Sequence, residues 1–197
     1  MTECNQKQFG FQALGNRQVV ADFKGGDISS DGGGLLLEEV EVRRGWLRDL
    51  AECFADHRSA EHTEHTVKQL VSQRVLALAL GYEDLNDHDL LRQDPLLAVL
   101  CGKDDPTGQD RRCVQDRGKA LAGKSTLNRL ELGREAGDRY KKIICNEDAL
   151  ASLFVDKFIS RRKHAPRRLV LDLDATDDPL HGDQEGRFFH GYYDCYC

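Results

Sequence analysis

The chain has 197 residues, which is enough for one domain or two small ones, and 40% of them are hydrophobic, which excludes a wholly disordered protein. Its formal net charge is −6, which taken alone argues weakly against a nucleic-acid partner. No apolar run approaches the ~18 residues that a membrane span needs, and the polar N-terminus lacks the features of a signal peptide. We therefore expect a cytoplasmic protein with no membrane partner.

Residues 31–101 are predicted to be mainly helical. Before them, within the polar residues 1–30, only RQVVADF at 17–23 has the pattern of a strand. Ser30 or Asp31 is expected to cap the first helix, and Gly45 and Gly81 follow apolar stripes in the way that glycines end helices. The expected helices are 31–42, 46–54, 64–80, 87–93 and 96–101, the last two divided by Asp94-Pro95.

The next segment begins with a polar loop over 104–123 and continues with helices over 125–137 and 146–162. In the second of these helices, apolar side chains recur at helical spacing and are expected to face inward. These side chains are Leu150, Leu153, Phe154 and Phe158.

The stretch GKALAGKST, Gly118–Thr126, fits the phosphate-loop pattern G-x-x-x-x-G-K-[ST]. A phosphate loop needs a buried strand before it, because the strand delivers the glycines to the amides of a helix N-terminus. The preceding residues 105–117 are charged and contain no apolar run of strand length. We interpret the stretch as the start of a helix, capped by Ser125 or Thr126, and expect no nucleotide cofactor.

Basic residues are concentrated in two segments of this acidic chain. Residues 111–142 contain ten Lys or Arg against four Asp or Glu, and residues 157–168 contain six Lys or Arg and no acid. Binding to phosphate responds to the local potential more than to the total charge, so these segments could bind nucleic acid. Solvated helix faces would explain the charges equally well.

The seven cysteines are scattered and are expected to be reduced thiols. Cys195 and Cys197 form a C-x-C without the second pair that a zinc site needs. A histidine cluster, His57, His62 and His65, lacks paired ligands on one helix face, so structural or solvated roles are expected for it.

After residue 163 the character changes to that of strands. LVLDLD at 169–174 is predicted to be one strand, and the aromatic residues 187–197 a second that pairs with it in antiparallel fashion through a turn at 178–182. The chain ends within this second strand. Further strands of such a sheet would have to come from residues that the chain does not contain, which would leave aromatic side chains and edge backbone exposed.

Two acidic side chains lie on the first predicted strand. Asp172 and Asp174 are two residues apart, so both carboxylates would project from the same face of the strand. Their mutual repulsion would be relieved by a divalent cation, and Mg²⁺ prefers such oxygen ligands. A solvated acidic turn is the alternative, because Asp-rich turns are common.

Four stretches in a fixed order give the chain a resemblance to a known family. They are ISSDGGGLLL (28–37), QRVLALALGYEDLNDHDLLRQDP (73–95), STLNRLE (125–131) and LVLDLDATDDPLHGDQEGRFFHGYY (169–193). Together they resemble the amino-terminal half of bacterial insertion-sequence transposases of the DDE superfamily, the group known as transposase DDE domain group 1. Each piece is weak by itself, and the ordered combination is specific.

The resemblance implies an α+β protein in which a helical DNA-binding region precedes the first strands of an incomplete RNase H-like domain. The expected divisions are 1–30, 31–163 and 164–197. Such enzymes hold two Mg²⁺ ions with Asp, Asp and Glu, and they cut and join DNA at transposon ends. The first Asp matches Asp174, with Asp172 as the runner-up.

The second Asp and the Glu of the family come from later strands, so we expect a truncated product that does not catalyse strand transfer alone. The alternative is a non-catalytic DNA-binding protein derived from a transposase. The implied partners are double-stranded DNA and a second copy or an intact transposase. Lys124, Asn128, Arg129 and Arg134, on the helix over 125–137, are the candidate DNA contacts, unless that helix face is merely solvated.

Overall fold

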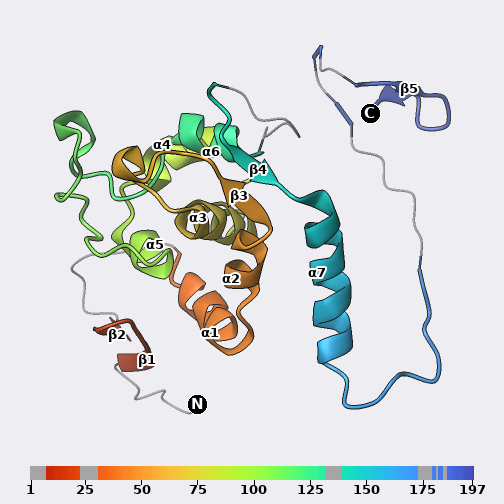
Figure 1. Ribbon diagram of the computed structural model, residues 1–197, viewed down its shortest axis with the longest axis horizontal. Helices are drawn as coiled ribbons and strands as arrows, with labels where there is room; N and C mark the ends of the chain where they lie inside the picture. The colour runs from red at the N-terminus through yellow and green to blue at the C-terminus, as the bar shows by residue number, and fades with distance from the viewer. Residues whose placement is uncertain (1–7, 23–30, 132–138, 173–178, 181, 184–185) are drawn as a thin grey trace, which may run out of the picture. The chain divides into compact units, whose positions relative to one another are not determined.

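The computed structural model describes residues 8–22, 31–131, 139–172, 179–180, 182–183 and 186–197. The chain divides into two compact units, Met1–Phe158 and Ile159–Cys197, and each is described by itself. The described residues combine helices with three antiparallel two-stranded sheets, β1-β2, β3-β4 and β5-β6, which confirms the α+β class (Figure 1).

A β-hairpin precedes the helices of the first unit. It pairs β1 (Gln8–Leu14) with β2 (Arg17–Asp22), and Gly15 takes the left-handed conformation that a two-residue turn needs, with φ 59°. The strand predicted over 17–23 is confirmed for 17–22, and residue 23 lies outside the described residues. The prediction of a single strand in this region is wrong, because Phe11 and Leu14 belong to a second strand, β1, that packs on the core.

Two helices follow the hairpin, α1 (Gly34–Arg44) and α2 (Trp46–Ala51). Gly45 separates them with φ 63°, as expected. The predicted side-chain cap at Asp31 is wrong, because the helix begins three residues farther along the chain. The Asp31 carboxylate instead accepts hydrogen bonds from the Tyr82 hydroxyl at 3.1 and 3.0 Å.

The helix α3 (Val67–Ala79) lies in the middle of the first unit (Figure 1). Thr66 and Gln69 form a reciprocal capping box at its start, which satisfies two amides that the helix leaves without partners. Leu76 and Ala77 join a core with α1 and α5, whereas Leu70 and Val71 join a second core with α6 and β4. Each such buried leucine contributes about 1.5–3 kcal/mol to folding.

The turn region after α3 is built by aspartates. Asp84 accepts from the Asn86 amide at 2.8 Å and begins the 3-10 helix η2 (Leu85–Asp87), which leads into α4 (His88–Leu91). Asp94 accepts from two amides, at 2.7 and 3.1 Å, and caps α5 (Pro95–Leu100). Two short helices divided by Asp94-Pro95 are therefore confirmed.

The predicted polar loop over 104–123 is confirmed, apart from one turn of 3-10 helix, η3 (Val114–Asp116). Its end is buried, because Ala120, Leu121 and Ala122 are each 1% exposed. The loop delivers the chain into α6 (Lys124–Glu131).

A short ladder that periodicity did not predict joins distant parts of the first unit. The strands β3 (Phe54–Asp56) and β4 (Ile143–Cys145) pair in antiparallel register, Phe54 with Cys145 and Asp56 with Ile143. Strands of three residues are too short to show alternation.

After β4 comes α7 (Glu147–Ser160), which confirms the expected helix. Its predicted inward face is wrong in part, since Phe154 is 57% exposed and Phe158 41% exposed. Where α7 meets the rest of the first unit, the Phe154 ring lies 6.1 Å from the Trp46 ring, and the Lys157 ammonium pairs with the Asp49 carboxylate.

The second unit does not contain the predicted strand in its described part. Residues 169–172 are coil, and Val170 and Leu171 are 77% and 81% exposed. The predicted partner pairs locally instead, as β5 (Phe189–His190) with β6 (Cys195–Tyr196). A strand needs a neighbouring strand for its backbone hydrogen bonds. Here the expected neighbour, residues 187–197, forms its own hairpin, and its Tyr196 carbonyl accepts a hydrogen bond from the Leu180 amide.

Candidate nucleic-acid interface

The β3–β4 ladder places two basic residues next to each other. The His57 amide donates to the Lys142 carbonyl at 2.8 Å, which continues the ladder beyond the strands and brings Arg58 beside Lys142. Asp56 holds the Arg58 guanidinium at two points, 2.8 Å from Nε and 2.7 Å from Nη2. Arg58 also donates to the His65 carbonyl at 2.9 Å, so its position is determined by three contacts.

Helix α6 supplies the opposite wall. Leu127 is fully buried and Leu130 is 6% exposed, so the other face of this short helix, with Thr126 and Arg129 one turn apart, points outward. The Asp89 carboxylate accepts from the Lys124 amide at 3.3 Å and so satisfies the start of the helix.

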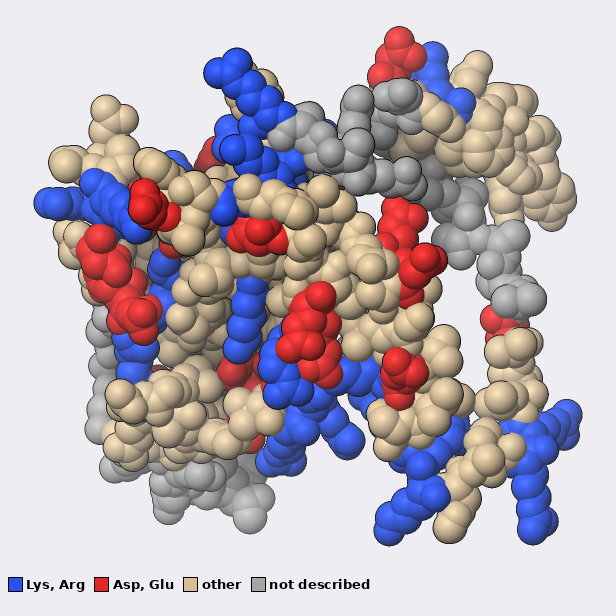
Figure 2. Space-filling view, viewed as in Figure 1, with Lys and Arg blue, Asp and Glu red and all other residues tan. Residues whose placement is uncertain are grey.

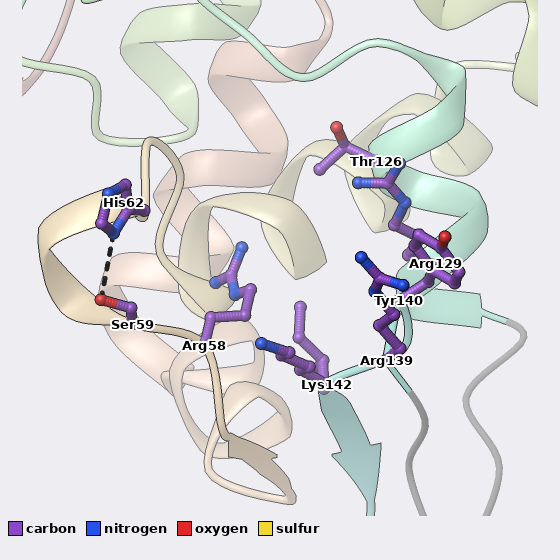
Figure 3. A pocket seen from close by; sticks show the side chains of 9 residues that line it. Arg58, Ser59, His62, Thr126, Arg129, Arg139, Tyr140 and Lys142 are labelled. Atoms are coloured by element: carbon purple, nitrogen blue, oxygen red, sulfur yellow. Dashed lines mark hydrogen bonds between the residues drawn. The ribbon is translucent and has the colours of Figure 1, made fainter.

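These elements enclose a hollow of about 350 Å³, which we call the α6 recess (Figure 3). Arg129 and Tyr140 lie on one side of it, Arg58 and His62 on the other, and Lys142 between them. Among the described residues that line the recess there is no Asp or Glu. The lining residues are Arg58, Ser59, His62, Thr126, Arg129, Arg139, Tyr140, Lys142 and Ile143.

The recess has a net positive charge, although the charge of Arg58 is offset by its ion pair with Asp56. Arg129, Arg139 and Lys142 form no ion pair with a described carboxylate, and all three are exposed. Lys and Arg side chains gather over the segment that leads into β4, beside α6 (Figure 2). Several cations in one hollow without carboxylates attract an anion with more than one charge, and the guanidinium groups suit phosphate oxygens in particular.

A second hollow, of about 320 Å³, shares four residues with the α6 recess and continues it. It contains acids as well as bases, and Arg111 lies buried at its base, 9% exposed, 3.4 Å from Glu64 and 3.7 Å from Asp116. This part is therefore closer to neutral, and its ion pairs stabilise the loop before α6. The shared residues are Arg58, His62, Thr126 and Arg129.

The four predicted DNA contacts have different places in the structure. Arg129 lines the α6 recess. Lys124 and Asn128 line a neighbouring hollow of about 450 Å³, where the Lys124 ammonium lies 3.4 Å from Asp89 and 2.9 Å from Asn86. Arg134 lies outside the described residues.

Three basic residues of the recess were not singled out from the sequence as candidate DNA contacts. Arg139 and Lys142 belong to the basic segment 111–142, which was the available signal. Arg58 had no signal, because only the β3–β4 ladder brings it there.

The phosphate-loop pattern at Gly118–Thr126 has the geometry of a buried loop before a helix. No strand precedes it, and two of its amides donate hydrogen bonds within the protein. The Leu121 amide donates to the Arg92 carbonyl at 3.1 Å, and the Ala122 amide donates to the Gln73 side-chain oxygen at 3.0 Å. The interpretation as a helix start is confirmed, although the helix begins at Lys124 and thus before the proposed cap Ser125.

Comparison with protein families supplies the assignment. The sequence model of transposase DDE domain group 1 matches residues 11–197. The chain belongs to this family. Searches of curated proteins and of solved structures gave no match. Transposases act on DNA, so membership of this family implies a DNA partner for the chain.

The most distinctive stretch of this transposase, residues 81–95, is explained by local structure. Within it Tyr82, Asp84 and Asp94 make the contacts described above, and Asp89 caps α6. His88 is fully buried, with Nδ1 3.0 Å from the Gln73 amide nitrogen. Asp89, and Gln73 through its hydrogen bonds with Ala122, support the start of α6.

The candidate metal ligands of the transposase are only partly described. Asp172 is exposed and lies on coil, and Asp174 is outside the described residues. Of the histidines, His65 is structural, as expected: it is 5% exposed, and its Nε2 lies 2.7 Å from the buried Arg111. Within the described ranges, no three His, Cys, Asp or Glu side chains form a group that could hold a metal. In the same ranges no helix has the length and apolarity to cross a membrane.

Proposed function

We propose that this transposase-family chain binds double-stranded DNA through its phosphates at the α6 recess, in the course of cutting and joining transposon ends. The observation that carries the proposal is a hollow with four basic side chains and no carboxylate among its described lining residues. The Arg58 guanidinium is already held by Asp56 and the His65 carbonyl, so little side-chain order has to be gained there on binding.

The test is a salt titration of duplex binding by fluorescence anisotropy, with the full chain. We expect Arg129→Ala and Lys142→Ala each to weaken binding roughly five- to tenfold and to reduce the slope of log K against log salt by about 1. Arg43→Ala is the matched control, because Arg43 is an exposed arginine of α1, paired with Glu39 at 3.4 Å and outside the recess. Equal losses in all three variants would refute the assignment of the recess.

The finer part of the proposal concerns magnesium-dependent cleavage with Asp174 as a metal ligand and Asp172 beside it, as the family resemblance implies. The described residues do not by themselves supply a magnesium site, so no catalytic step is assigned to a metal. A supercoiled plasmid containing a transposon end, incubated with the full chain and Mg²⁺, provides the assay. Any cleavage should be lost in Asp174→Asn and retained in Asp183→Asn, an exposed aspartate of the same unit.

A non-catalytic DNA-binding protein is the second candidate function, favoured by the coil conformation of residues 169–172. Salt-dependent duplex binding without any cleavage in Mg²⁺ would support this alternative. Cleavage that depends on Asp174 would exclude it.

A further inference from the structure

The α6 recess is a hollow, whereas the binding of duplex phosphates requires only a positively charged surface. Phosphates of duplex DNA lie on an outer ridge, and a flat or convex basic surface is enough to bind them. Here the cations surround a hollow of about 350 Å³, which lies within the range of pockets that accept small ligands, about 300–1,000 Å³. A duplex backbone would leave the inside of this hollow empty.

The inside has surfaces that a phosphate does not use. Tyr140 is 67% exposed and forms one wall, and Ile143, 3% exposed, is an apolar lining residue at its base. Across the hollow, the His62 ring is held by a hydrogen-bond contact of 3.2 Å between its Nδ1 and the Ser59 hydroxyl (Figure 3). The walls therefore present rings and apolar surface as well as positive charge.

The exposed ring of Tyr140 is placed by its neighbours. The Arg139 guanidinium lies 5.6 Å from the centre of the Tyr140 ring, at cation–π distance. Ile143 follows three residues later and is bound into the β3–β4 ladder, which anchors the segment. The ring is therefore presented beside Arg129 and Lys142 rather than against the core.

An aromatic ring next to several phosphate-binding cations is the combination by which proteins bind single-stranded nucleic acid, because the base stacks on the ring while the phosphates meet the cations. We propose that the α6 recess takes one unpaired nucleotide of the bound DNA, with its base against Tyr140 and its phosphates toward Arg58, Arg129 and Lys142. This inference rests on the proposed DNA binding at the same recess.

The alternatives use only part of these features. A free inorganic phosphate or an intact duplex would contact the cations and would be indifferent to Tyr140. Dependence on the aromatic ring is therefore the property that separates an unpaired nucleotide from the other anions.

The experiment compares two DNAs of equal length, a blunt duplex and a duplex with a three-nucleotide single-stranded overhang, with the full chain at one salt concentration. The wild-type chain should prefer the overhang DNA roughly 10-fold. Tyr140→Ala should abolish this preference, whereas Tyr140→Phe, which retains the ring, should keep it. A 2-aminopurine base in the overhang should lose fluorescence on binding through stacking, and this loss should disappear in Tyr140→Ala.

Tyr192→Ala is the control, because Tyr192 is 85% exposed and lies in the other unit. No preference in the wild-type chain, or a preference that survives Tyr140→Ala, overturns the inference. If duplex binding still depends on Arg129 in that case, the proposed function stands and only the nucleotide site is refuted. If neither DNA binds, both are refuted.

Discussion

Replacing Gly108 with alanine is expected to destabilise the first unit by roughly 2–5 kcal/mol. Gly108 has a φ of +67°, and an added Cβ would lie 2.5 Å from the Ala120 amide nitrogen and 2.8 Å from the Lys119 carbonyl carbon. These are backbone atoms, so they cannot move aside as a flexible side chain would. The change therefore adds steric overlap to the strain of a left-handed conformation. Urea or thermal unfolding measures the loss.

Gly102→Ala provides the matched control. Gly102 has nearly the same conformation, with φ +72°, but no atom lies within 4 Å of its added Cβ. It should lose only the conformational part, about 1–2 kcal/mol. Similar losses in the two variants would mean that the close approach of Gly108 to Ala120 does not matter.

The Gly108 variant also bears on the DNA interface. The loop that contains Gly108 leads through the buried Ala120–Ala122 to Lys124, where α6 starts. We expect Gly108→Ala to weaken duplex binding at temperatures where the chain is still mostly folded, because Arg129 would lose its fixed position in the recess. Gly102→Ala should leave duplex binding unchanged.

Local features of the fold could be predicted from the sequence. Gly45 and Gly81 adopt left-handed conformations next to helix ends, with φ 63° and 97°, and Asp94-Pro95 begins a helix. Such signals act within a few residues, so a single sequence contains them in full. The helix over 67–79 was predictable for the same reason, because its apolar stripe repeats over several turns.

Long-range pairing could not be predicted in this way. The apolar run at 169–173 has the composition of a strand, yet its described part is coil, because strand formation also depends on a neighbouring edge. The reverse holds for Phe54–Asp56, which is too short to recognise and becomes a strand because Ile143–Cys145 lies beside it.

The candidate site shows the same difference between local signals, which the sequence contains, and long-range pairing, which it does not reveal. Arg129 was found because the helix that carries it is visible in the sequence, together with its exposed face. Arg58 was missed because its place in the recess depends on the β3–β4 ladder. The apolar side of α7 was also misjudged, because periodicity shows which side is apolar but not whether another element covers it.

Acidification is expected to destabilise the first unit, with a net loss on the order of 3 kcal/mol between pH 7 and pH 4. Burial lowers the pKa of His65 from its ordinary 6.5 to about 3, and that of His88 to about 4. The charge of the nearby Arg111 adds to the effect on the His65 pKa. The folded chain keeps both rings neutral while the unfolded chain binds protons below pH 6.5, so stability falls as the pH drops from 6.5 toward 4.

Glu38 opposes this loss. Burial, together with the neighbouring Glu41, raises the pKa of the Glu38 carboxyl from its ordinary 4.5 to about 7. The folded chain therefore takes up this proton first, and the stability gained is complete below pH 4.5 and is lost as the pH rises through 7. Between pH 7 and pH 4, the stability gained through Glu38 is about equal to the stability lost through one of the two histidines.

The opposing contributions can be separated by mutation. Glu38→Gln removes the carboxyl that gains a proton, so unfolding free energies measured in urea from pH 7 to 4 should fall more steeply in this variant than in the wild-type chain. His88→Gln should make the fall shallower, because one of the two buried rings is gone, and His62→Gln, at an exposed histidine, should leave it unchanged. Carboxyls with lowered pKa values, such as Asp56 and Asp105, begin to cost stability only below about pH 5, where the unfolded chain starts to protonate them, and they do so equally in all these proteins. A slope that is the same in all four proteins would show that neither the buried rings nor Glu38 change their protonation on unfolding.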